Sequence, residues 1–337
     1  MPASPHPYKV VAPFLDGFLR TEALAAAFEL GIIRTLEPDR AATPAALAER
    51  LSLDPFHLQI LLDILTHDGV LHKGPDGVSL AEGFRAALAY RDLLEVRMEF
   101  GRRHRRTVMD NYAASIRDPY RNQGRLHQFK FHPMPDYTPA LRAETEVWVR
   151  FISTFTRYAA PTMIERHDFS RYRHVLDIGG NNGELAVQLC RVHPDLRVTV
   201  FDIPVVCDIG TERVAKDGLA DRIAFIKGDA KSDPLPRGAD AAVFSTVLTD
   251  HTPENVDLFL GKTYEALAPG TDLVIWEPAE IDLVRDGYHE WELDLFPFIS
   301  TWGPPTRYED AVRRAGFRDI RSEQVEEIRF LYTTAKR

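Results

Sequence analysis

Apolar residues in the first part of the chain recur three and four positions apart, which predicts helices with one apolar face. The pattern covers 13–36, a shorter stretch at 44–51 that Thr43 would cap, and 55–68. Glycine and proline at 74–77 then separate two short apolar runs, as in a hairpin. Helix, helix and hairpin in this order are typical of a winged helix.

The apolar period changes near residue 174, where short apolar runs begin to alternate with amphipathic helices. The runs predict strands at 174–179, 197–202, 223–229, 239–248 and 272–277. Such alternation is typical of a parallel sheet with helices on both faces. We therefore predict an α/β fold, in which a Rossmann-like sheet follows a helical, winged-helix-like domain.

Three parts are expected along the chain. They are a winged-helix-like domain at 1–100, a mostly helical segment at 101–165 that links the parts and covers a pocket, and a ligand-binding domain at 166–337. A winged helix suggests DNA binding, but 55–68 contains two Asp and no Lys or Arg, and the net charge is −9. Because nucleic-acid binding requires positive charge, packing against another helix or subunit explains this helix better, and no nucleic-acid partner is expected.

Composition narrows the setting further. The 337 residues include only two cysteines, Cys190 and Cys207, so neither a disulfide framework nor a cysteine-based zinc site is expected. No apolar stretch is long enough to span a bilayer, and the N-terminus lacks the pattern of a signal peptide. We therefore expect a cytoplasmic protein with no membrane partner.

The candidate ligand site lies where the predicted strands end. A glycine-rich turn at 179–183 follows the first strand, and Asp202 and Asp229 end the second and third. Because the carboxyl ends of parallel strands share one edge of the sheet, these groups are expected to meet there. Glycine lets the backbone approach a ligand, Asp202 suits two ribose hydroxyls, and Asp229 suits an adenine amino group. The pattern predicts an adenosine cofactor.

Two adenosine cofactors compete for such a turn. Gly179, Gly180 and Gly183 do not form the G-x-G-x-x-G of dinucleotide-binding proteins, since Asn181 interrupts it. Asp177 precedes the turn, and its carboxylate would repel a pyrophosphate but attract a cation. S-adenosylmethionine, which carries a sulfonium and an amino group, is therefore the predicted cofactor.

Five tracts carry a resemblance to a known family: 175–183, 201–204, 228–230, 247–251 and 266–270. On them the chain resembles the S-adenosylmethionine-dependent O-methyltransferases of the caffeate and hydroxyindole type, including bacterial relatives in natural-product and pigment pathways. The resemblance implies a class I methyltransferase sheet, an N-terminal dimerisation domain, and a homodimer whose front half helps to close the active site. It also implies a small-molecule methyl acceptor, aromatic or polyketide-like.

The same resemblance assigns cofactor contacts. Gly179 and Gly183 would shape the turn around the methionine part of the cofactor. Ala230 and Ser245 fall where the family places further cofactor contacts, with Ser245 in place of a residue that is often basic.

The catalytic tract departs from the family. The family motif Leu-His-Asp-Trp is replaced by Leu-Thr-Asp-His at 248–251, so Thr249 stands in place of the general base. Threonine is no base near neutral pH, whereas histidine is. One family glutamate is missing, and another is kept as Glu277. We expect a catalytic group of His251, Asp250 and Glu277, in which Glu277 braces the base.

Three hypotheses fit this substitution. In the first, His251 replaces the missing base. In the second, a carbon or nitrogen nucleophile is methylated without a base, through proximity alone. In the third, the fold serves hydroxylation, decarboxylation or cyclisation. A hypothesis of another class is a winged-helix regulator that senses S-adenosylmethionine, which would need a basic, exposed recognition helix that 55–68 does not supply.

Several side chains are candidates for the acceptor pocket: Trp148, Phe151, Phe155, His289, Trp291, Phe298 and Trp302. Four side chains have the chemistry of a metal site: Asp250, His251, His289 and Glu290. No tight ligand spacing such as H-E-x-x-H joins them, so no metal is expected. A basic run at 102–106 is either a solvated helix face or a contact for an anionic substrate group.

Overall fold

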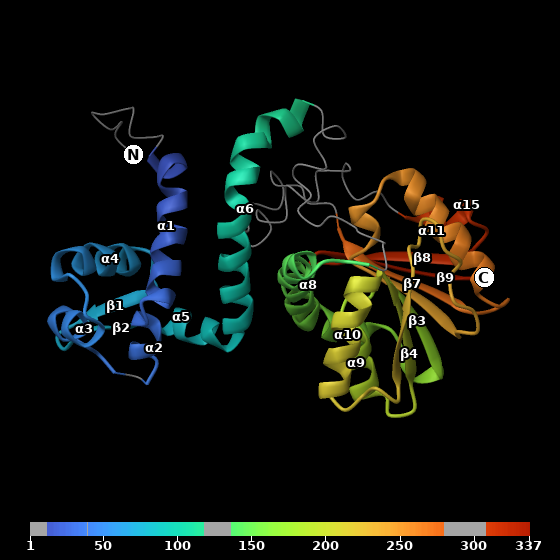
Figure 1. Cartoon of the computed structure of the whole chain (residues 1–337), viewed down its shortest axis with the longest axis horizontal. Helices are drawn as coiled ribbons and strands as arrows, with labels where there is room; N and C mark the ends of the chain where they lie inside the picture. Colours follow the sequence, from blue (N-terminus) through green and yellow to red (C-terminus); the bar gives the residue numbers. More distant parts are fainter. Residues whose placement is uncertain (1–11, 39, 118–135, 280–307) are drawn as a thin grey trace. The chain divides into compact units, whose positions relative to one another are not determined.

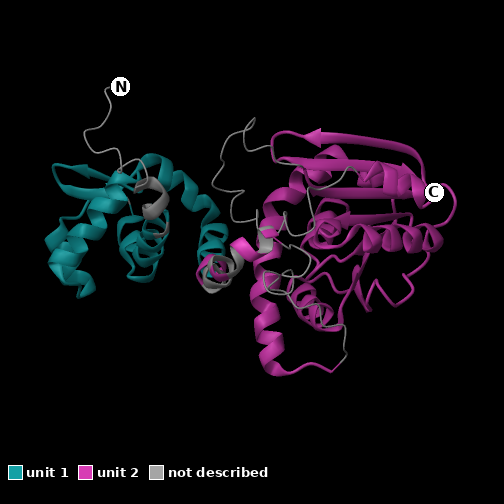
Figure 2. Cartoon of the chain, turned by 90° about the horizontal axis from the view of Figure 1, so that it is seen from above, with its two compact units in different colours: residues 1–99 teal, residues 100–337 magenta. Residues whose placement is uncertain are grey.

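The computed structural model of the chain (Figure 1) describes residues 12–38, 40–117, 136–279 and 308–337. The chain forms two compact units, 1–99 and 100–337, which we consider one at a time (Figure 2). The segment 101–165, predicted to link the parts, belongs to the second unit. In the described part of the chain, every helix is too short or too polar to cross a membrane.

The first unit is helical with one small hairpin. Its elements are α1 (Ala12–Glu29), α2 (Ile32–Leu36), α3 (Pro44–Leu51), α4 (Pro55–His67), β1 (Leu71–Gly74), β2 (Gly77–Leu80), α5 (Glu82–Ala87), a 3₁₀ turn (Leu88–Tyr90) and the start of α6 (Arg91–Arg117). Thr43 caps α3 by accepting a hydrogen bond from Ala46 N at 3.2 Å, and Asp54 caps α4 through His57 N at 2.9 Å. The helices and the hairpin predicted between 43 and 80 are therefore present.

An apolar core holds this unit together. The inward faces of α2, α3 and α4 bury Leu36, Leu47 and Leu62 almost completely. Each such side chain contributes about 2 kcal/mol when it leaves water. The other face of α4 exposes Phe56 and Ile60, at 70% and 46%.

A seven-stranded sheet with the order β5-β4-β3-β6-β7-β9-β8 forms the second unit (Figure 1). Its strands are β3 (His174–Ile178), β4 (Arg197–Asp202), β5 (Ile223–Lys227), β6 (Ala241–Ser245), β7 (Asp272–Pro278), β8 (Arg318–Val325) and β9 (Phe330–Lys336). Strands β3 to β7 run parallel, while β9 and β8 are antiparallel. All five predicted strands are present, though β5 and β6 end two and three residues earlier than predicted. β8 and β9 extend the sheet beyond the prediction.

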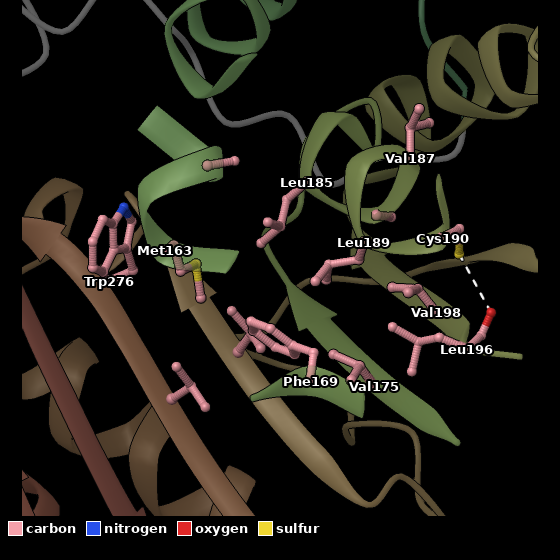
Figure 3. Close-up of a cluster of buried hydrophobic side chains, with 14 of the residues drawn as sticks. Met163, Phe169, Val175, Leu185, Val187, Leu189, Cys190, Leu196, Val198 and Trp276 are labelled. Atoms are coloured by element: carbon pink, nitrogen blue, oxygen red, sulfur yellow. Dashed lines mark hydrogen bonds between the residues drawn. The ribbon is translucent and has the colours of Figure 1, made fainter. Parts of the chain in front are cut away.

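Helices cover both faces of this sheet. They are α8 (Pro139–Arg166), α9 (Glu184–Val192), α10 (Pro204–Lys216), α11 (Pro253–Ala266) and α15 (Glu309–Arg314), with 3₁₀ turns η3 (Phe169–Arg171) and η4 (Leu248–Asp250). Side chains alternate along each strand, so Val175 joins a core with Met163 of α8 and Leu189 of α9 (Figure 3). Leu176 points to the other face and joins a second core with Phe259 of α11. The sheet is thus held between two apolar cores, one on each face, and its strands are fixed in position.

Candidate functional site

A cavity of about 350 Å³ lies in the second unit, at the carboxyl ends of the parallel strands. Its wall includes the glycine turn after β3, the end of β4, the loop after β5, the turn after β6, and one face of α8. The register explains this convergence, because Ile178 of β3 pairs with Phe201 of β4, and both strands end within one residue of that pair. The structure therefore brings together the strand ends that the sequence singled out.

The glycine turn is tightly packed. Gly179 has a φ of +71°, and an added Cβ would lie 2.8 Å from Cγ2 of Val247. At Gly180 an added Cβ would overlap the carboxylate of Asp177. Both glycines line the cavity, whereas Gly183 is the N-cap of α9 and lies against the Phe225 ring. Gly183 therefore shapes the end of the turn where α9 starts and does not line the cavity itself.

Asp177 is a buried acid on the cavity wall. It is 1% exposed, and neither carboxylate oxygen has a hydrogen-bond partner among the described residues. Burial and the nearby charge of Asp202 raise the pKa of Asp177 to about 7. Such a group is best satisfied by a donor or a cation from a ligand.

Asp202 lies next to the turn at the end of β4. Its carboxylate accepts hydrogen bonds from Asn181 N at 2.9 Å and from Ile203 N at 2.7 Å. Burial raises the pKa of Asp202 to about 6, although the two backbone donors favour the charged form. It lines the cavity, and two donors leave lone pairs on its oxygens for a ligand.

The loop after β5 is fixed by its own hydrogen bonds. The carboxylate of Asp229 accepts from Lys231 N at 2.9 Å, and Lys262 Nζ donates to Ala230 O at 2.8 Å. Asp229, Ala230 and Lys231 all line the cavity, as does Ser245 at the end of β6. One wall thus carries four residues that we predicted for the cofactor, namely Asp202, Asp229, Ala230 and Ser245.

Glu277 holds the turn after β6. Because Ser245 pairs with Trp276 in parallel strands, Glu277 lies just beyond the end of β6. One of its oxygens accepts from Val247 N and Leu248 N, both at 2.8 Å, and the other accepts from Thr249 N at 3.3 Å and Thr249 Oγ1 at 3.1 Å. Glu277 therefore braces the backbone of this turn, whereas we expected it to brace the side chain of the base.

Asp250 and His251, which come directly after the residues bound by Glu277, line the cavity. Asp250 is half-buried, no described residue donates a hydrogen bond to its carboxylate, and burial raises its pKa to about 7. The His251 ring packs edge-on against Phe259, with centroids 4.8 Å apart. The structure places Asp250 and His251, two of the three predicted catalytic residues, at the cavity, and the hydroxyl of Thr249 faces Glu277.

One face of α8 forms another wall, which the sequence revealed only in part. Trp148, Ile152 and Thr156 line the cavity at a spacing of four residues. This spacing places the three side chains on one face of the helix, although only Trp148 is aromatic. Phe155 lies elsewhere on the helix, where its ring stacks on Phe330 at 6.0 Å and packs against the core. It is not among the residues that line the cavity, so its predicted substrate contact does not match its position.

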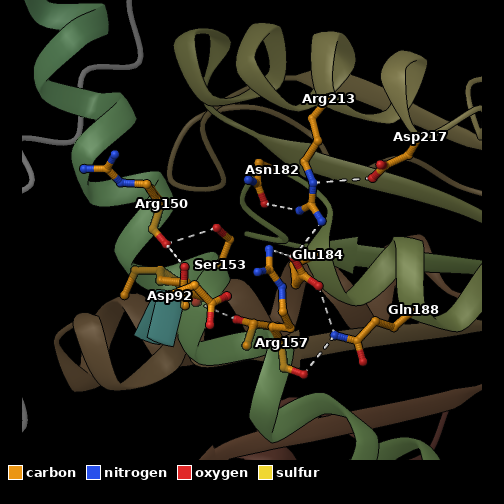
Figure 4. A network of polar contacts seen from close by, with 12 residues as sticks. Asp92, Arg150, Ser153, Arg157, Asn182, Glu184, Gln188, Arg213 and Asp217 are labelled. Carbon is orange, nitrogen blue, oxygen red and sulfur yellow. Dashed lines mark hydrogen bonds and ion pairs between the residues drawn. The ribbon is translucent and has the colours of Figure 1, made fainter. Parts of the chain in front are cut away.

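Glu184 is a cavity residue that sequence reasoning missed (Figure 4). It is buried at the start of α9, where it pairs with Arg213 at 2.6 Å and Arg157 at 3.4 Å. Gln188 donates to its other oxygen at 3.0 Å, and Arg213 also donates to Asn182 Oδ1 at 2.8 Å. The network ties the glycine turn to α8 and α10. An acid directly after a glycine turn was the available signal.

Other predicted residues lie outside the described part of the chain. They are His289, Glu290, Trp291, Phe298 and Trp302. Within the described residues, no group of three or more His, Cys, Asp or Glu is arranged to hold a metal ion.

Two family models match the sequence. One describes an O-methyltransferase domain and matches residues 127–318, and the other describes an O-methyltransferase dimerisation domain and matches residues 13–94.

Individual proteins are similar as well. A 3-hydroxy-5-methyl-1-naphthoate 3-O-methyltransferase of Streptomyces sahachiroi is 32% identical over 172 residues, half of each chain. The N,N-dimethyltransferase OxyT of Streptomyces rimosus is 28% identical over 92% of this chain and 90% of its own. The structure of human N-acetylserotonin methyltransferase in complex with SAM has a TM-score of 0.77 at 20% identity, covering 100% of this chain and 99% of that one. The predicted fold class is confirmed.

Proposed function

Because this chain belongs to the S-adenosylmethionine-dependent O-methyltransferase family, we propose that the cavity in its second unit holds S-adenosylmethionine and that its acceptor is a small aromatic or polyketide-like metabolite. When bound, S-adenosylmethionine supplies an electrophilic methyl group on a cationic sulfur. The observation that carries the proposal is Asp177, a buried carboxylate on the cavity wall without a partner among the described residues. A cationic ligand would compensate this charge.

The chain's own residues fit such a cofactor. The backbone at Gly179 and Gly180 would let the cofactor approach closely, because neither residue has a side chain. Asp202 would accept hydrogen bonds from ribose hydroxyls with the lone pairs that its backbone donors leave over. Asp229 would accept a hydrogen bond from the adenine amino group. The remaining proposed cofactor residues are Ala230, Ser245 and Gly183.

The turn at 248–251 is the proposed proton-accepting end of the cavity. His251 takes the proton of a hydroxyl acceptor, Asp250 adds negative charge beside it, and Glu277 positions both through the backbone. Help from a general base of this kind accelerates a reaction roughly 10²–10⁴-fold. Proposed substrate contacts outside the described residues are His289, Trp291, Phe298 and Trp302.

The setting of the enzyme is part of the proposal. The match to the dimerisation domain and the exposed apolar residues of α4 support a homodimer. Both cysteines are free and buried, which agrees with a reducing compartment and hence the cytoplasm. The naphthoate-methylating relative supports a place in natural-product metabolism.

Titration calorimetry tests the cofactor. We expect S-adenosylmethionine and S-adenosylhomocysteine to bind the full chain, and Asp202→Asn to weaken both about tenfold to a hundredfold, because it removes a charged hydrogen-bond acceptor. The control Asp221→Asn makes the same change at an exposed position and should bind as the unmodified protein does. Failure of either cofactor to bind the unmodified chain would contradict the proposal.

Mass spectrometry tests the reaction. The protein is incubated with S-adenosylmethionine and a panel of hydroxynaphthoates, hydroxyindoles and simple phenols. S-adenosylhomocysteine together with an O-methylated product supports the proposal. Cofactor binding combined with hydroxylation, decarboxylation or cyclisation of a panel member would instead favour a repurposed enzyme, for which the substitution at Thr249 is the motivating observation.

A further inference from the structure

Two acids on the cavity wall have no hydrogen-bond donor among the residues that the structure describes. Neither oxygen of Asp177 is hydrogen-bonded in the described part of the chain. Burial alone acts on the pKa of Asp250, with no hydrogen bond from a described residue. Asp177 is the penultimate residue of β3, and Asp250 ends the turn η4 after β6, so they belong to different segments of one wall. Within the described residues, neither carboxylate therefore forms a hydrogen bond or an ion pair that stabilises the fold.

The other acids of the same cavity have partners within the described part of the chain. Glu184 pairs with Arg213 and Arg157. Asp202 accepts two backbone hydrogen bonds, and Asp229 accepts one. Lys231 also lines the cavity and adds a positive charge in the loop after β5. Among the described residues, the cavity acids that accept no hydrogen bond and form no ion pair are therefore Asp177 and Asp250.

Donor and product of methyl transfer differ in charge. S-adenosylmethionine carries a positive sulfonium, whereas S-adenosylhomocysteine has a neutral thioether at the same sulfur. Resting on the proposed function, we propose that Asp177 and Asp250 make this cavity select the cationic sulfonium over the neutral thioether. In surroundings of intermediate dielectric, a negative charge about 10 Å from a cation raises the affinity for that cation roughly tenfold. The cavity would then release the spent cofactor more readily than the donor.

Proton binding makes this selectivity depend on pH. Burial raises the pKa of both Asp177 and Asp250 to about 7, and Asp202 adds to the effect at Asp177. Two titratable groups from other elements interact with Asp250: Glu277 of β7, and Tyr308, which directly precedes α15. His251 is the next residue along the chain.

The direction of the pH effect follows from these pKa values. Below pH 7 both acids are mostly protonated and give a cation little attraction. Above pH 7 they are charged, and a bound cation favours that form further, so binding releases protons. Affinity for a cationic ligand should therefore rise with pH, while affinity for the neutral thioether changes less.

Calorimetry on the full chain with three ligands at pH 6, 7 and 8 distinguishes an effect of the ligand's charge from an effect of its other contacts. Sinefungin is the third ligand, because it places an amine cation where S-adenosylmethionine has its sulfonium. We expect the Kd of S-adenosylmethionine and of sinefungin to rise roughly tenfold from pH 8 to pH 6, and that of S-adenosylhomocysteine to rise less than about threefold. Repeating the titration in buffers of different ionisation enthalpy should show proton release for the two cations only.

Variants identify the responsible acids. Asp250→Asn and Asp177→Asn should each reduce the preference for sulfonium over thioether about tenfold, whereas Asp310→Asn, at an exposed surface position, should leave it unchanged. His251→Gln should keep the pH dependence. The inference is overturned if all three ligands shift in parallel with pH, or if His251→Gln alone removes the preference. If neither S-adenosylmethionine nor S-adenosylhomocysteine binds at any pH, the proposed function itself fails.

Discussion

At the scale of single residues, Glu277 shows how one buried acid shapes a site that it does not enter. It is 0% exposed, and its two oxygens accept from three backbone N–H groups and one hydroxyl. Burial raises its pKa to about 7, while the three backbone donors favour the charged form. The side chain of Glu277 thus fixes the backbone that leads into Asp250 and His251. Thr249 is one of its hydrogen-bond partners.

Replacing this acid tests its positioning role. Glu277→Gln keeps the shape but turns one acceptor into a donor that faces Thr249 N, so we expect a loss of about 2 kcal/mol in the free energy of unfolding. Urea unfolding followed by tryptophan fluorescence measures it, because all four tryptophans of the sequence lie beyond residue 147, in the second unit. Glu265→Gln, an exposed change on α11, is the control. Equal stability of the two variants would argue against a positioning role.

At the scale of elements, the glycine turn and the turn after β6 lock into each other. Val247 of the second turn fills the space above Gly179 of the first, where a side chain would otherwise lie. On the other side, Gly180 leaves room for the carboxylate of Asp177. The close contact explains why these positions carry glycine, and it makes the cavity wall a single packed unit.

A methyl group tests that packing. Gly180→Ala places a Cβ against the carboxylate of Asp177, which has to move, so we expect the Kd for S-adenosylmethionine to rise at least about tenfold. Calorimetry measures the Kd. Gly261→Ala is a matched control inside α11, where an added Cβ meets nothing within 4 Å, and it should change stability by less than about 1 kcal/mol and affinity not at all. An unchanged Kd in Gly180→Ala would show that the turn tolerates a side chain.

At the scale of the whole molecule, the chain combines a methyltransferase domain with a dimerisation domain. The first unit buries one face of α4 and leaves Phe56 and Ile60 exposed on the other. Exposed apolar groups on a short amphipathic helix are typical of a surface that another protein covers. A second copy of the chain is the proposed occupant.

Charge on α4 tests the homodimer. In a twofold-symmetric interface each substitution acts twice, so Phe56→Glu combined with Ile60→Glu should remove about 4 kcal/mol or more of association energy. Light scattering after size exclusion should then report a monomer at micromolar concentration, against a dimer for the unmodified chain. Leu258→Glu, at an exposed position of α11 in the second unit, should remain a dimer. A double variant that stays dimeric would place the interface elsewhere.

The parts of the molecule that could be predicted from the sequence are those that depend on residues close together along the chain. Strand period and the acids at strand ends located Asp177, Asp202 and Asp229, because parallel strands bring their carboxyl ends to one edge. The partners of Glu277 depend on the register of β6 against β7, which the sequence does not display. Glu184 was missed for a similar reason, since its arginine partners come from helices far along the chain.

The bonds from Glu277 to the turn after β6 have an evolutionary consequence. Three of its four donors are backbone N–H groups, which every residue type except proline carries. The side chain at position 249 can therefore be exchanged while the loop keeps its shape. A protein built this way can lose or regain a catalytic group by a single substitution, which lets related enzymes diverge in chemistry without redesigning the scaffold around it.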